Sequence, residues 1–97
     1  MSDSIVINKE MGITHQEFFR NIPRVLGDAD YVKSDSGIVL QDGEKHLEIA
    51  VSAEGERRIA LFVLPVTHVT LTFMGYSEDA ITTIIEKFDR AFQRGGG

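Results

Sequence analysis

The sequence predicts a two-layer α+β domain in which two amphipathic helices pack against an antiparallel sheet. Apolar residues recur at helical spacing in two segments, one near each end of the chain. Between them, from residue 31 to residue 74, the apolar period changes to two, which is typical of strands. The 97 residues suffice for one globular domain, which we place at 1–94, followed by a flexible glycine tail at 95–97.

The composition argues against several classes of protein. Ten basic and fifteen acidic residues give a net charge of -5, which disfavours nucleic-acid binding. Cysteine is absent, so disulfides, thiolate nucleophiles and zinc–thiolate sites are excluded. No apolar run approaches the roughly 20 residues that span a bilayer, and the first residues do not have the pattern of a signal peptide. We therefore expect a small, acidic, cytoplasmic protein that does not insert into membranes.

The N-terminal part of the chain predicts a strand and a helix. Apolar residues alternate over 4–9, which allows a short extra strand there. Thr14 with Glu17 has the spacing of a capping box, and Gly27 is a natural stop, so the first helix lies between them. Pro23 interrupts this helical pattern, and we expect a kink or a break there.

The middle of the chain predicts a four-stranded antiparallel meander. Asp42-Gly43 is a strong signal for a two-residue hairpin with a type I′ turn. Glu54-Gly55 predicts a second turn, and Pro65 interrupts the chain at a third junction. Strands that are neighbours in sequence are then expected to pair in space. The four strands are expected at 37–41, 44–51, 57–64 and 68–74.

The C-terminal helix has clear signals at both ends. Ser77 is its expected N-cap, and the acidic residues that follow interact favourably with the helix dipole. Basic residues lie near its C-terminal end, and Gly95 is the expected stop. The two helices therefore come before and after the predicted meander.

One predicted strand is apolar on both faces, which points to an interaction surface. The run 59–64 contains only apolar residues, so one side can face the core while the other needs separate cover. The N-terminal segment, a second copy of the chain, or a partner protein or apolar ligand could supply that cover. The predicted partner-binding residues are Ala60, Phe62, Leu64, Thr70 and Thr72.

These features favour a non-catalytic interaction module that needs no cofactor and binds a protein partner or forms a homodimer. No carboxylate pair or nucleophile motif predicts catalysis, because the acidic pairs lie in expected turns. One alternative is a small-molecule or metal binder, since alternation places His46, Glu48 and His68 on one face. In a meander the intervening strand would hold the two histidine strands roughly 9–10 Å apart, which is wide for shared ligation.

A second alternative concerns the last residues, Gly95-Gly96-Gly97. This tail resembles the C-terminal di-glycine of ubiquitin-like sulfur carriers, in which the terminal carboxylate is activated and converted to a thiocarboxylate. The resemblance implies a carrier role for Gly96 and Gly97. It covers only these residues, and here the tail follows a helix, whereas in those carriers it follows a strand. The other interpretation is a helix stop followed by a frayed end.

Overall fold

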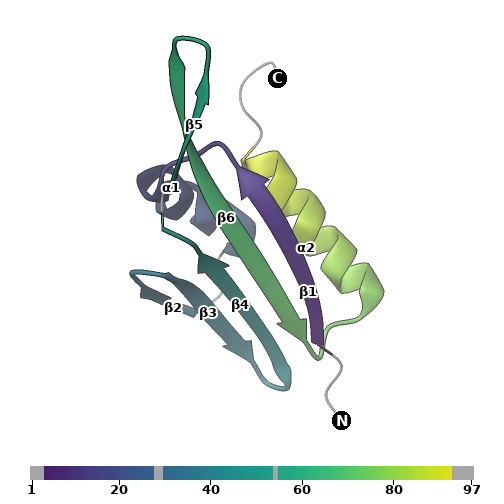
Figure 1. Cartoon of the computed structure of the whole chain (residues 1–97). Coiled ribbons are helices and arrows are strands. Elements are labelled where there is room, and N and C mark those ends of the chain that lie inside the picture. The colour runs from purple at the N-terminus through teal and green to yellow at the C-terminus, as the bar shows by residue number, and fades with distance from the viewer. Residues whose placement is uncertain (1–3, 28–29, 54, 93–97) are drawn as a thin grey trace.

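A curved antiparallel sheet carries both helices on one face, as Figure 1 shows for the computed structural model of the chain. The structure describes residues 4–27, 30–53 and 55–92. The elements confirm the α+β class and follow in the order β1 (Ser4–Met11), α1 (His15–Leu26), β2 (Tyr31–Ser34), β3 (Gly37–Asp42), β4 (Lys45–Val51), β5 (Gly55–Ile59), β6 (Phe62–Met74) and α2 (Glu78–Ala91). Neither helix is long and apolar enough to cross a membrane.

The strand order differs from the predicted four-stranded meander. Five strands lie in the order β1-β6-β4-β3-β2, and all of these neighbours are antiparallel. The extra N-terminal strand is confirmed as β1, which pairs with β6 along its whole length. The expected strand 57–64 is wrong, because β4 pairs directly with β6 and the chain between them turns back at Ala60-Leu61. The remaining strand, β5, pairs only with the first part of β6.

The hairpin between β3 and β4 is confirmed, but its turn lies one residue further along the chain than expected. Asp42 pairs with Lys45, so Gly43 and Glu44 are the two central residues. Gly43 has a φ of 61°, whereas Glu44 does not have a positive φ. Glycine at the first central position alone is the pattern of a type II′ turn, while type I′ requires positive φ at both positions.

The core lies between the sheet and the two helices. The alternating apolar residues of β3, β4 and β6 face inward and meet the apolar stripes of α1 and α2. Phe18, Ile49, Val69, Leu71 and Phe88 have no exposed surface at all. Among the described residues no helix covers the opposite face of the sheet, and most side chains on that face are half-buried or exposed.

Helix α1 begins and ends where the sequence predicts, and it continues through Pro23, so of the expected kink or break the break does not occur. The Thr14 side chain accepts a hydrogen bond from the Glu17 backbone N–H at 3.1 Å, which caps the first turn. The helix continues through Pro23 to Leu26, and the Gly27 N–H then donates to the Pro23 carbonyl at 2.8 Å. In α2 the Ser77 hydroxyl accepts from the Ala80 N–H at 3.2 Å and plays the same capping role.

Candidate functional site: an apolar hairpin arm

Strand β5 and the first residues of β6 form a two-stranded hairpin that projects beyond the rest of the sheet (Figure 1). We call residues 55–66 the arm. Gly55 pairs with Val66 at its base, and Ile59 pairs with Phe62 next to its tip. Strand β1 reaches β6 only from Thr67 onward, and β4 only from Val69, so neither neighbour extends alongside the arm.

The tip of the arm is the most apolar exposed part of the described chain. Leu61 exposes 98% of its surface and Phe62 exposes 69%. Ile59, Val63 and Leu64 expose 52%, 52% and 44%. Because side chains alternate along a strand, Phe62 and Leu64 lie on one face of the arm and Val63 on the other. Each face of the arm therefore carries apolar side chains that are open to solvent.

The turn at the tip has an unusual residue at its first central position. Ala60 has a φ of 54°, and it is the one non-glycine residue in the described ranges with a positive φ. This left-handed region costs an L-residue about 1–2 kcal/mol because Cβ approaches the backbone. The two-residue connection between Ile59 and Phe62 holds Ala60 in this conformation.

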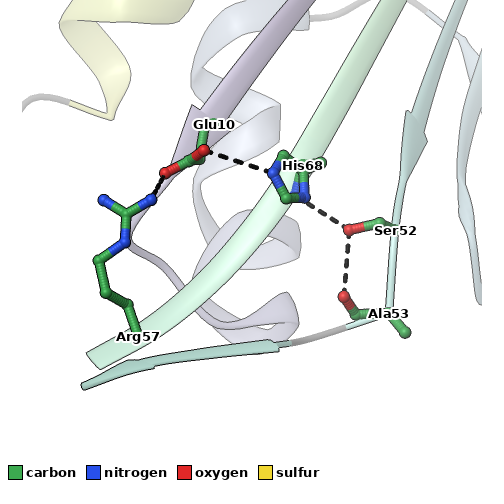
Figure 2. A network of polar contacts seen from close by, with 5 residues as sticks. All are labelled: Glu10, Ser52, Ala53, Arg57 and His68. Carbon is green, nitrogen blue, oxygen red and sulfur yellow. Dashed lines mark hydrogen bonds and ion pairs between the residues drawn. The ribbon is translucent and has the colours of Figure 1, made fainter. Parts of the chain in front are cut away.

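A polar network on the outer face of the sheet fixes the base of the arm (Figure 2). The Arg57 guanidinium of β5 forms an ion pair with the Glu10 carboxylate of β1. The other Glu10 oxygen lies 3.5 Å from His68 Nε2. The backbone N–H of His68 donates to the Ser52 hydroxyl at 2.9 Å, and the Ser52 N–H donates to the His68 carbonyl at 2.9 Å. The network therefore connects the arm to β1 and to the end of β4.

Two further hydrogen bonds anchor the chain close to this network. The buried Thr67 hydroxyl donates to the Ile13 carbonyl at 2.8 Å, just where β6 leaves the arm and enters the sheet. His15 Nε2 lies 2.5 Å from the Ser52 carbonyl oxygen and links the start of α1 to the end of β4. The arm thus projects from a well-connected part of the molecule.

The predicted partner-binding residues divide between two places. Ala60, Phe62 and Leu64 lie in the arm, where all three are exposed. Thr70 and Thr72 lie further along β6 on the outer face of the sheet, where both are half-buried. Thr70 donates a hydrogen bond of 3.0 Å to the Asn8 side chain on β1. From Phe62 to Thr70 the strand advances about 26 Å, so the two groups do not form one compact patch.

The structure does not bring the candidate metal ligands together. The expected intervening strand is absent, and β4 lies directly beside β6. His46 pairs with Met74, however, and His68 lies six residues before Met74 on β6, about 20 Å away. His46 instead contacts the Gln41 side chain at 2.6 Å and lies 3.8 Å from the Glu48 carboxylate. No group of three or more histidine or acidic residues in the described ranges could hold a metal ion.

Two surface cavities adjoin the described elements. One, of about 310 Å³, lies at the base of the arm and is lined by Thr14, Gly55, Glu56, Val63 and Pro65. The other, of about 440 Å³, lies between the C-terminal ends of the two helices and includes Arg24 and Arg90. Both arginines occupy the last turn of a helix, where positive charge stabilises the helix dipole.

Other candidate groups lie away from the arm. Burial, with a smaller contribution from the negative charge of Asp42, raises the pKa of Tyr76 above its ordinary value. Tyr76 follows the opposite end of β6 and packs edge-on against Phe73, with ring centroids 5.5 Å apart. The predicted carrier residues Gly96 and Gly97 lie outside the described residues.

Sequence reasoning did not identify Leu61, the most exposed apolar residue of the arm. The apolar pattern predicts one continuous strand over 57–64, which leaves no place for the turn at Ala60-Leu61. The available signal was Pro65, because proline is tolerated where a strand lacks a neighbour on one side. Comparison of the chain with protein-family models, with curated proteins and with solved structures found no match.

Proposed function

We propose that this protein is a non-catalytic interaction module whose arm is buried against another protein chain. The observation that carries the proposal is the exposed apolar tip, in which Leu61 exposes 98% and Phe62 69% of their surfaces. The exposed fractions of the five large apolar residues of the arm correspond to roughly 500 Å² of apolar surface. A contiguous patch of that size commonly marks an interaction site on a soluble protein.

No other segment of the described chain buries the apolar side chains of the arm. The N-terminal segment was one expected source of cover, but β1 pairs with β6 only from Thr67 onward. Leu61, Phe62 and Val63 remain exposed with both helices and all strands in place. Water contact with these side chains is unfavourable, and an interface that encloses the arm would remove it.

The experiment is site-specific photo-crosslinking in the cells that produce the protein. A photoreactive benzoyl-phenylalanine replaces Leu61 in one chain and Val32 in a control chain. Val32 is a matched control because it is also apolar and 71% exposed, but it lies on β2, far from the arm in the sheet order. We expect light-dependent crosslinks to a discrete protein species from position 61 and none from position 32.

A second variant separates contact from random collision. Phe62→Asp in the position 61 chain should abolish the crosslinks, because a carboxylate opposes burial of the arm. Its amide NMR spectrum should keep the dispersion of the folded chain, since Phe62 lies outside the core. Equal crosslinking from positions 61 and 32, or crosslinks that survive Phe62→Asp, would contradict the proposal.

A further inference from the structure

We infer that the chain that binds the arm is a second copy of this protein, joined edge to edge through antiparallel pairing of the two β5 strands about a two-fold axis at Arg57. The inference rests on the proposed function and names its partner. The two arms then form a four-stranded ribbon in the order β6-β5-β5-β6, with one molecular body at each end. Because each arm projects beyond its own sheet, the bodies are separated along the ribbon (Figure 1).

The first argument is the open edge of β5. Strand β5 pairs with β6 along one side, and none of the other described strands pairs with it on the opposite side. An unpaired edge presents backbone donors and acceptors to any strand that lies alongside. An identical strand satisfies both edges at once, and the resulting interface has the closed symmetry of a dimer.

The second argument is that charge selects one register. Antiparallel strands related by a two-fold axis place one residue opposite its own copy, and the residues on either side of it are then paired. With the axis at Arg57, Glu56 lies opposite Arg58 of the second copy, and this favourable pair occurs twice. Each of the axes at Glu56, Arg57 and Arg58 places one charged residue opposite its own copy, but only the axis at Arg57 adds opposite-charge pairs within Gly55–Ile59.

The third argument is that two charged side chains of β5 have no ion-pair partner among the described residues of their own chain. Neither Glu56 nor Arg58 forms an ion pair or side-chain hydrogen bond with the other described residues. Arg57, which would face its own copy, is already paired with Glu10 of the same chain, and this pair reduces the repulsion at the axis. Charged residues usually protect an edge strand from pairing, but here their alternating signs favour self-pairing in a single register.

The fourth argument is the fit between the tip of one arm and the base of the other. In this register Ile59 of the second copy lies opposite Gly55. Gly55 has no side chain, and a carbon placed on it would meet only the Val66 carbonyl oxygen, at 3.7 Å, so nothing at this position obstructs the Ile59 side chain.

The decisive experiment is a charge exchange measured by sedimentation equilibrium. The wild-type chain should dimerise in a concentration-dependent way. Glu56→Arg and Arg58→Glu each create two like-charge pairs, so each should raise the dimer dissociation constant at least about tenfold. The double variant restores opposite charges and should return the constant to within about threefold of wild type. Glu44→Arg, an equal charge change in the exposed β3–β4 turn, should have little effect.

A disulfide test probes the axis itself. The chain has no cysteine, so Arg57→Cys introduces one thiol that would face its own copy across the axis. Directly opposed antiparallel residues have Cα atoms about 4.5–5.5 Å apart, which suits a disulfide. Mild oxidation should therefore convert Arg57→Cys to a covalent dimer and leave the control Val32→Cys monomeric.

The outcomes separate this inference from the function on which it rests. A wild-type chain that stays monomeric at every concentration overturns the second-copy inference, and so does a double charge variant that fails to recover association. If the position 61 probe then crosslinks a different protein, the proposed function still stands. If that probe crosslinks no protein at all, both fail.

Discussion

Gly37 is the residue at which the close approach of β3 and β4 depends most directly on glycine. Its φ is 153°, and a Cβ atom there would lie 2.0 Å from the Ile49 carbonyl oxygen, a distance that no side chain can adopt. Alanine at this position must therefore push the two strands apart. Its backbone must also adopt a conformation that L-residues rarely adopt.

We predict that Gly37→Ala lowers the free energy of unfolding by at least about 2 kcal/mol. Gly43→Ala is the matched control, because Gly43 also has a positive φ, of 61°, but no atom lies within 4 Å of the added carbon. Gly43→Ala should lower the free energy of unfolding by only about 1 kcal/mol, because alanine is strained at a positive φ. Urea denaturation of the two variants measures the difference, and equal losses would contradict the predicted clash.

At the scale of the element, α1 is a helix that tolerates a proline near its end. Pro23 cannot donate a hydrogen bond to the Phe19 carbonyl, and its ring crowds the preceding turn. The stripe of Phe18, Ile22 and Val25 packs into the core and holds the helix in place despite this cost. Tertiary packing therefore outweighs the local preference of the backbone.

Pro23→Ala is predicted to raise the free energy of unfolding by about 1–2 kcal/mol. The restored N–H can bond to the Phe19 carbonyl, and the greater freedom of the unfolded chain offsets only part of the gain. Pro23 is exposed, so no core contact is lost. Arg20→Ala, an exposed change in the same helix, should stay within about 0.5 kcal/mol. Chemical denaturation tests both, and an unchanged or lower stability for Pro23→Ala would count against this account.

The elements that depend on local patterns could be predicted from the sequence. Thr14 and Ser77 marked the starts of both helices, because a capping hydroxyl satisfies backbone donors only a few residues away. The alternation in β4 places His46 and Glu48 on one face, and the structure shows that face outside the core while Leu47 and Ile49 between them are buried. The partner of each strand could not be predicted, because pairing of β6 with β1 and β4 depends on contacts between distant segments.

The arm could not be recognised for a different physical reason. A turn is usually marked by glycine, asparagine or proline, but Ala60 adopts the positive φ here and Leu61 completes the turn. An apolar run was also assumed to be covered, whereas these side chains are exposed. The proposed role of Phe62 and Leu64 in contact with a partner stays a prediction, and the structure adds Leu61 to it.

At the scale of the whole molecule, the core and the arm are expected to contribute very differently to stability, and one phenylalanine in each part tests this. Phe88 is fully buried between α2 and the rest of the core, while Phe62 exposes 69% of its surface on the arm. Phe88→Ala should lower the free energy of unfolding by about 3–5 kcal/mol. Phe62→Ala should change it by less than about 0.5 kcal/mol.

Both variants are best measured in the Arg58→Glu background, in which dimer formation is expected to be weakened and contributes little to stability. Thermal and urea unfolding give the two values. A loss of several kcal/mol from Phe62→Ala in this background would place the arm within the folding core and contradict its description as an exposed projection.

The arm is an excursion between two strands that already pair with each other. Val51, the last residue of β4, faces Val69 of β6, so these two strands pair with each other outside the arm. Mutations that lengthen or shorten the hairpin, or that change its side chains, can therefore accumulate with little effect on the sheet and the helices. If the arm binds a partner as proposed, its binding specificity can change with little effect on the stability of the sheet.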